Sequence, residues 1–147
     1  MKTSTVALGV FSEGTMKDDE VGGAIADLLR PLRLSRTHRA LIREWDALIA
    51  RADENDDTTH EPIQDVCGEL WTALDDYLPP YTYAGGSEWD GACYGVWPIT
   101  DDDDLLRYEA GEEPAGSGDC YSVTDHGNVS CGRRLKNGRW VEYWSVV

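Results

Sequence analysis

The stretch 129–147 reads VSCGRRLKNGRWVEYWSVV, and it decides the fold class of the chain. Two runs with β-branched and aromatic residues flank the dipeptide Asn137-Gly138, and Asn-Gly is a strong short-range signal for a β-hairpin. Both residues tolerate the positive φ angles of a type I′ turn. We therefore predict a two-residue turn that pairs Lys136 with Arg139.

Continuing this register away from the turn predicts which residues face one another across the hairpin. Four pairs share one face: Leu135 with Trp140, Arg133 with Glu142, Cys131 with Trp144, and Val129 with Val146. We expect this face to be the core side of a sheet, with one ion pair across it.

Further strands are predicted on the N-terminal side of the hairpin. A reversal at residues 125–128, Asp-His-Gly-Asn, would add a strand at 120–124 and extend the hairpin to an antiparallel meander. Other β-type runs lie at 81–83, 92–97 and 105–108, and one lies within residues 1–11.

Three amphipathic helices are predicted between the first strand and the others. The first begins at about Asp18, which is expected to cap it, and ends before Pro31. The second covers about 36–53, with Ser35 or Thr37 as its cap. The third follows residues 58–59 and ends before the prolines at 79–80.

These elements predict an α+β fold with three N-terminal helices packed on a C-terminal antiparallel sheet of about three to five strands. The length of 147 residues is typical of a single domain, 1–147. Its helical part is expected at about 18–78 and its β-rich part at about 81–147. The sequence has no apolar run of membrane-spanning length and no secretory signal pattern, so we expect a cytoplasmic protein.

The charge of the chain is strongly negative and unevenly distributed. With 28 acidic and 13 basic side chains, the formal net charge is −15. Residues 52–132 hold twenty acidic residues and one basic residue, a net charge of −19. Such a segment opposes direct binding to nucleic acid. Solvated loops or adaptation to high salt would explain this density, and so would a basic partner.

The candidate partner-binding residues are the acidic clusters of this segment together with one aromatic neighbour. They are Asp75, Asp76, Glu88, Trp89, Asp90, Asp101, Asp102, Asp103, Asp104, Glu112 and Glu113. Carboxylates on a folded scaffold imitate the phosphates of a nucleic acid, and a neighbouring aromatic side chain supplies specificity. These residues therefore predict a surface that competes with nucleic acid for a basic groove.

Other kinds of site receive little support from the sequence. The glycine-rich loop 85–91 has no Lys and carries two acids, so we interpret its glycines as turn residues. The run 101–104 lacks the ligand spacing of an EF-hand, and the Cys and His residues lack the close pairs of a zinc site. His126 is the one catalytic candidate, in a predicted turn beside Asp125. We expect no catalytic residue, metal or cofactor.

Five arginines form the one basic patch of the chain: Arg30, Arg33, Arg36, Arg39 and Arg43. Their spacing of three or four places the last three on one helical face, which raises an alternative function as a DNA-binding regulator. We expect these arginines instead to pair internally with the acidic loops. A small hydrolase or metal-binding protein that uses His126 is a further alternative.

Several stretches of the C-terminal half resemble a group of small acidic proteins carried by phages and plasmids. They are YLPPYTY at 77–83, Asp90-Gly91 followed by GVWP at 95–98, DHGNV at 125–129 and EYWSVV at 142–147. The resemblance implies a mobile-element origin and assigns no activity or site. Together with the charge, it favours a non-enzymatic inhibitor of a host defence complex, similar in strategy to acidic anti-CRISPR or anti-restriction proteins. The expected partner is a basic nucleic-acid-binding protein or CRISPR effector complex in the cytoplasm of the host cell.

Overall fold

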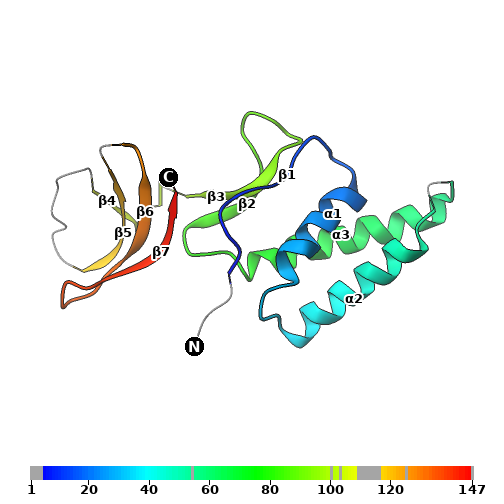
Figure 1. The fold of residues 1–147 in the computed structure, drawn as a ribbon, viewed down its shortest axis with the longest axis horizontal. Coiled ribbons are helices and arrows are strands. Elements are labelled where there is room, and N and C mark those ends of the chain that lie inside the picture. Colours follow the sequence, from blue (N-terminus) through cyan, green and yellow to red (C-terminus); the bar gives the residue numbers. More distant parts are fainter. Residues whose placement is uncertain are drawn as a thin grey trace. The chain divides into compact units, whose positions relative to one another are not determined.

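The computed structural model describes residues 5–53, 55–99, 101–102, 104–108, 117–124 and 126–146. They fall into two compact units (Figure 1). The helical unit comprises Met1–Leu78 and Tyr83–Trp97, and the sheet unit comprises Pro79–Thr82 and Pro98–Val147. The chain is α+β, as predicted, and its helices precede the C-terminal strands. Its organisation as a single domain with parts at about 18–78 and 81–147 stays a prediction.

Three helices form most of the helical unit: α1 (Asp18–Leu29), α2 (Arg36–Arg51) and α3 (His60–Asp75). The Ser35 hydroxyl caps α2 by accepting a hydrogen bond from the His38 amide, as predicted. The expected cap of α1 was wrong. Asp18 is the first helical residue, Lys17 occupies the N-cap position, and the Lys17 side chain makes no capping hydrogen bond. A short 3₁₀ helix, η1 (Asp57–Thr59), leads into α3.

The helices pack so closely that α1 has no room for a side chain at Gly22. A Cβ atom at that position would lie 2.3 Å from Cη2 of Trp45, which is 2% exposed on α2. This glycine weakens α1 as an isolated helix, yet it lets the indole of Trp45 rest on the helix backbone. The core around this contact includes Ile25, Leu29 and Leu70, all with 0% exposure.

The helices share this core with strands of a three-stranded sheet. The sheet has the order β1-β3-β2, with β1 (Gly9–Ser12), β2 (Thr82–Gly86) and β3 (Tyr94–Pro98). Val96 of β3 is 1% exposed and belongs to the helical core. The expected single C-terminal antiparallel sheet was wrong, because the strands divide between two sheets.

The second sheet lies in the sheet unit and has the order β4-β5-β6-β7. Its strands are β4 (Leu106–Tyr108), β5 (Gly118–Val123), β6 (Val129–Arg134) and β7 (Trp140–Val146). The strands β5, β6 and β7 form the predicted antiparallel meander. The sheet is mixed, however, because β4 pairs with β5 in parallel. Its buried side chains are those of Leu105, Cys120, Tyr121, Cys131 and Trp144.

The hairpin of β6 and β7 has the predicted register only at the end far from its turn. Cys131 pairs with Trp144 as predicted. Nearer the turn the register shifts by one residue, so that Arg133 faces Val141 and the expected ion pair with Glu142 is absent between these described residues. The Gly138 amide donates to the Leu135 carbonyl, and the Leu135 amide donates to the Arg139 carbonyl. The loop thus has three residues instead of two.

The type I′ turn was the wrong prediction because only one residue of the loop has a positive φ. Gly138 has a φ of 83°, whereas Asn137 has a negative φ. This combination is a type I turn that ends in a left-handed glycine, and Asn-Gly suits it as well as it suits type I′. The bulge beyond Cys131, opposite Tyr143, then restores the predicted register.

Within the sheet unit, side-chain hydrogen bonds connect the segment Pro79–Thr82 to the strands. Tyr81 is the only described non-glycine residue with a positive φ, 59°, and such a backbone costs about 1–3 kcal/mol. Its hydroxyl donates a 2.5 Å hydrogen bond to Oδ2 of Asp119. The Trp144 indole donates to the Pro80 carbonyl at 2.8 Å. These bonds offset the strain and fix the segment against β5 and β7.

Asp119 is the centre of this polar network. Its Oδ1 accepts a 2.8 Å hydrogen bond from the hydroxyl of Tyr143 and lies 3.4 Å from Nε of Arg133. Burial raises the pKa of the Asp119 carboxyl, but the bonds from Tyr81 and Tyr143 and the charge of Arg133 outweigh it and hold this pKa below its ordinary value. Arg133 thus has an acidic partner, but on β5 rather than on β7.

Candidate acidic binding sites

The structure places the predicted acidic residues in three groups. Asp75 and Asp76 lie at the C-terminal end of α3, and a second group, Glu88, Trp89 and Asp90, lies in the loop between β2 and β3 of the helical unit. The third group, Asp101, Asp102 and Asp104, precedes β4 in the sheet unit. Asp103, Glu112 and Glu113 lie outside the described residues.

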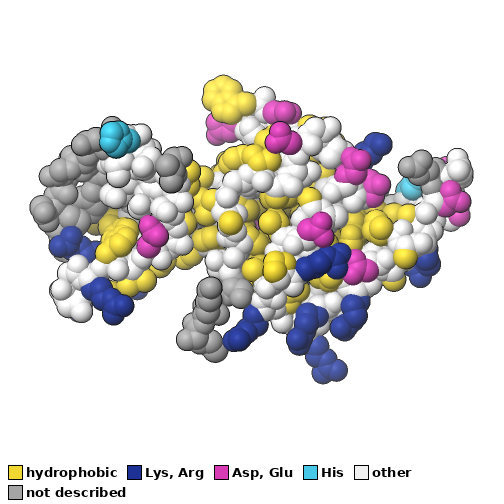
Figure 2. Space-filling model, viewed as in Figure 1, with side chains coloured by type: hydrophobic (Ala, Val, Ile, Leu, Met, Phe, Trp, Pro, Cys, Tyr) yellow, Lys and Arg dark blue, Asp and Glu magenta, His cyan; other side chains and the backbone are white. Residues whose placement is uncertain are grey.

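The loop between β2 and β3 presents an aromatic side chain to solvent. Trp89 is 93% exposed, although its backbone is held by hydrogen bonds within the loop. Its amide donates to Oγ of Ser87, and the Ser87 amide donates to the Cys93 carbonyl. Oδ1 of Asp90 accepts from the Ala92 amide. The loop therefore displays a large apolar group between two carboxylates, and Figure 2 shows hydrophobic and acidic side chains together at its tip.

The aspartates before β4 form a turn as well as a charged cluster. Oδ1 of Asp102 accepts from the Asp104 amide, and the Asp102 carbonyl accepts from the amide of buried Leu105. Asp101 and Asp104 are exposed. One carboxylate thus starts the turn into β4, and two others extend into solvent.

A further acidic site lies in a groove between α2 and α3, with a volume of about 630 Å³. Four carboxylates line it, those of Glu44, Asp65, Glu69 and Asp76, and no Lys or Arg belongs to its lining. Of these four residues only Asp76 was predicted. The other three are dispersed in the sequence, but the spacing of Asp65 and Glu69 places them one helical turn apart on α3.

A histidine and a tyrosine hold the two helices together at one end of this groove. The buried hydroxyl of Tyr77 accepts a 3.0 Å hydrogen bond from the Ser35 amide and lies 2.7 Å from Nδ1 of His38. Nε2 of His38 lies 3.6 Å from Oδ2 of Asp76. These contacts join the start of α2 to the end of α3 through one tyrosine and one histidine side chain.

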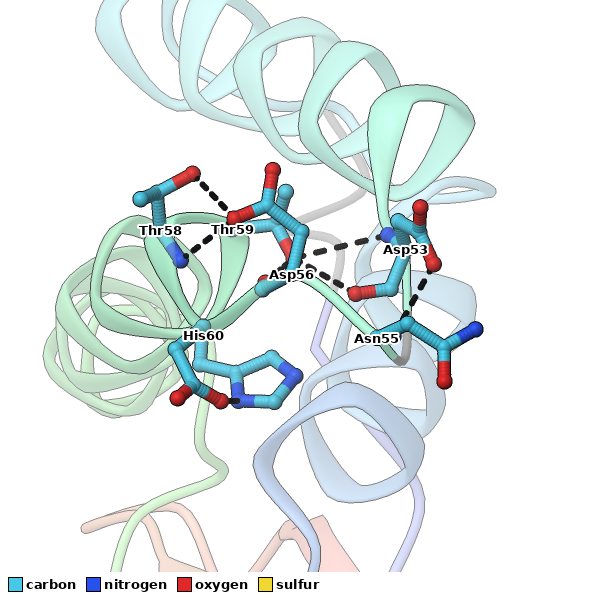
Figure 3. Close-up of polar contacts among 7 residues, drawn as sticks. Asp53, Asn55, Asp56, Thr58, Thr59 and His60 are labelled. Carbon is cyan, nitrogen blue, oxygen red and sulfur yellow. Dashed lines mark hydrogen bonds and ion pairs between the residues drawn. The ribbon is translucent and has the colours of Figure 1, made fainter.

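Beyond the groove, where α2 ends and α3 begins, a hydrogen-bonded loop joins the two helices (Figure 3). Oδ1 of Asp53 accepts from the Asn55 amide, and Oδ1 of Asp56 accepts from both the amide and the hydroxyl of Thr58. The Thr59 hydroxyl donates to the carbonyls of Asp53 and Asp56. These polar side chains satisfy the backbone of the loop and so fix the connection between the helices that form the groove.

The loop also has acidic and amide residues at alternate positions, as calcium loops do. Its carboxylates do not converge, however, and among the described residues no group of three or more His, Cys, Asp or Glu side chains is placed to hold a metal ion. All four cysteines are free thiols, and burial raises the pKa of Cys67 to about 11 and that of Cys131 to about 12. His126 is exposed in its turn, and Asp125 lies outside the described residues.

The expected pairing of the arginine patch with the acidic loops is not found among the described residues, and the one arginine that pairs does so with helical carboxylates. The Arg30 guanidinium donates two hydrogen bonds to the Asp46 carboxylate, from Nη1 at 2.8 Å and from Nη2 at 2.6 Å, and a third from Nε to Asp27. The other four, Arg33, Arg36, Arg39 and Arg43, have no ion pair with a described carboxylate. Figure 2 shows basic side chains gathered over α2 and the loop before it.

Comparison with protein-family models, with curated proteins and with solved structures finds no match to this chain. No helix in the described part of the chain has both the length and the apolar character of a membrane span.

Proposed function

We propose that this chain is a non-enzymatic binding protein that attaches to the basic surface of a nucleic-acid-binding protein and blocks it. The observation that carries this proposal is the hydrogen-bonded loop that exposes 93% of Trp89 between Glu88 and Asp90. A tryptophan of this exposure gains free energy when a partner covers it, and tryptophan is enriched among the residues that dominate interfaces.

The charge of the chain defines the kind of surface that would receive this loop. A net charge of −15 attracts a basic surface over a distance of about one Debye length, roughly 8–10 Å, and raises the rate of encounter. Nucleic-acid-binding grooves are surfaces of that kind, because they are built to neutralise phosphates. The carboxylates would then occupy phosphate positions, and the chain would compete with DNA or RNA.

The finer form of the proposal is an inhibitor of a host defence complex, with a CRISPR effector as its first target and a restriction enzyme as its second. The acidity of residues 52–132 supports this choice, and the resemblance that we infer for the C-terminal half to small acidic proteins of phages and plasmids suggests the kind of target. Such an inhibitor needs no catalytic group, since occupation of the groove is enough.

The experiment is affinity capture from a bacterial host lysate at low and high salt, with and without competing duplex DNA. We expect Trp89→Ala to weaken retention of the partner by about 30-fold, which corresponds to roughly 2 kcal/mol. Met16→Ala is the matched control, because Met16 is an exposed apolar residue of the same unit. A partner retained equally by both variants would contradict the role of Trp89.

A second set of variants tests the electrostatic part of the proposal. Changing Asp101, Asp102, Asp103 and Asp104 to Asn removes four charges, while the side-chain amide oxygen introduced at position 102 still accepts the turn hydrogen bond. We expect capture to weaken and its salt dependence to decrease, with an unchanged circular dichroism spectrum. Unchanged affinity and unchanged salt dependence would refute the phosphate-like role of this cluster.

One observation favours a second candidate function, a DNA-binding regulator. Arg33, Arg36, Arg39 and Arg43 are exposed and have no ion pair with a described carboxylate. A gel-shift assay with random duplex DNA at moderate salt decides between the two functions. A shift that is lost in Arg36→Ala/Arg39→Ala would support the regulator, and the absence of any shift would remove it.

A further inference from the structure

We propose that the groove between α2 and α3 is a docking site for a basic amphipathic α-helix of a partner protein. The inference rests on the proposed function, since it names the element of the basic partner that the helical unit would hold. The groove is a different part of the helical unit from the Trp89 loop, so the groove inference can be refuted while the proposed function stands.

The apolar part of the groove lining, called its floor here, consists of four residues, three of which are small. Ala40 and Leu41 contribute from α2, and Gly68 and Ala73 contribute from α3. A Cβ atom added at Gly68 would have no heavy atom within 4 Å, so the space above this glycine is open. Small residues allow the backbone of a third helix to approach α2 and α3 closely.

Four carboxylates line the groove and no Lys or Arg does, since the arginines of α2 lie outside its lining. Glu44 projects from α2, and Asp65, Glu69 and Asp76 project from α3. The whole of α3 contains no Lys or Arg, so its own sequence supplies no cation to these carboxylates. Lys or Arg residues spaced three or four apart on an incoming helix would face carboxylates that repeat at the same spacing.

These features distinguish a basic helix from other occupants. An open groove cannot enclose a small molecule, which usually buries most of its surface in its site. DNA and RNA are repelled by the four carboxylates. A second copy of this chain would bring a net charge of −15, which opposes association. A basic helix combines an apolar stripe for the floor with cations for the carboxylates of α2 and α3.

The test uses a synthetic helical peptide with Leu and Ala on one face and Lys at i, i+4 positions beside it. A peptide of the same composition but scrambled order, and one with Glu in place of Lys, are the controls. We expect the first peptide to shift the amide resonances of Ala40, Gly68 and Thr72 in ¹⁵N-labelled protein and to bind less tightly as salt increases. Shifts confined to other parts of the chain, or equal binding of the scrambled peptide, would overturn the inference.

Two groove variants and one matched control make the test specific. We expect Gly68→Leu, which fills the open space above this glycine, and Asp65→Asn/Glu69→Gln, which removes two of the three carboxylates on the α3 side, each to weaken binding of the peptide at least tenfold. Gly23→Leu is the control, because Gly23 lies on α1 and its added Cβ also meets open space. Unchanged affinity in Gly68→Leu, with a folded protein by circular dichroism, would overturn the proposed site.

The two proposals fail in different experiments. Trp89→Ala should leave peptide affinity unchanged, because the loop that carries Trp89 is not part of the groove lining. If Trp89→Ala loses the captured protein while the peptide does not bind, the proposed function stands and the groove inference is refuted. If the peptide binds in the groove while no basic protein is captured, the inference stands and the proposed function is refuted.

Discussion

Two adjacent glycines of α1 should respond to the same substitution with opposite signs. Gly22→Ala places a Cβ atom 2.3 Å from Cη2 and 2.8 Å from Cζ2 of Trp45, whereas Gly23→Ala places it in open space. Replacing Gly by Ala within a helix gains about 0.5–1 kcal/mol. Gly23→Ala should therefore stabilise the helical unit by about that amount.

At Gly22 the same gain is opposed by a steric clash. Trp45 is 2% exposed and cannot rotate into solvent, so either its ring or the α1 backbone must move. Such overpacking costs about 1–3 kcal/mol, and the larger part of that range applies because 2.3 Å is far below van der Waals contact. The net effect should be a loss of about 1–2 kcal/mol. The two variants should then differ by about 2–3 kcal/mol.

Urea denaturation monitored by tryptophan fluorescence and by far-ultraviolet circular dichroism measures this difference. We expect the midpoints of the two variants to lie on opposite sides of the wild-type midpoint, with similar slopes. A Gly22→Ala variant as stable as Gly23→Ala would refute the packing of Trp45 on the backbone of α1.

Three further predictions test the caps, the polar network and the thiols. Ser35→Ala should destabilise α2 by about 1 kcal/mol because it removes the cap bond, while Thr37→Ala should have little effect; thermal unfolding compares them. Asp119→Asn should destabilise the sheet unit by about 1–3 kcal/mol at pH 7. The pKa of Asp119 is lower in the folded state, so its contribution to stability is present above the unfolded pKa of about 3.9 and is lost as the pH falls through the folded pKa. The difference in stability between Asp119→Asn and wild type should therefore shrink below about pH 4. A difference that stays constant with pH would contradict the proposed network. At pH 8 a thiol reagent should label half-buried Cys93 first and label buried Cys131 only after unfolding, and rapid native labelling of Cys131 would contradict its burial.

The helices could be predicted from the sequence because their signals are local. Ser35 caps α2 in the structure as its position suggests, and the third helix ends before the prolines at 79–80. The turn of the final hairpin was harder, because Asn-Gly is compatible with a two-residue or a three-residue loop. The division of the strands into two sheets depends on contacts between distant segments, such as β1 with β3, and no local pattern reports them.

The candidate sites, like the sheets, depend partly on contacts between distant segments that the sequence does not show. Counting charges along the chain identifies acids that are adjacent in sequence, as at Glu88 and Asp90, and the exposure of Trp89 confirms only that this loop is accessible. Glu44 and Asp65 meet in one groove because α2 and α3 pack side by side, and they are 21 residues apart. A helical projection of α3 places Asp65 and Glu69 on one face, and α3 has no Lys or Arg. These two signals in the sequence could have identified the α3 side of the groove.

The path of the chain between its two units has a genetic consequence. The polypeptide passes from one unit to the other at three points, after Leu78, after Thr82 and after Trp97. No single breakpoint in the coding sequence separates the units, because residues 79–82 belong with the C-terminal strands while 83–97 belong with the helices. A single crossover anywhere in the coding sequence therefore leaves at least one unit with segments from two different parents.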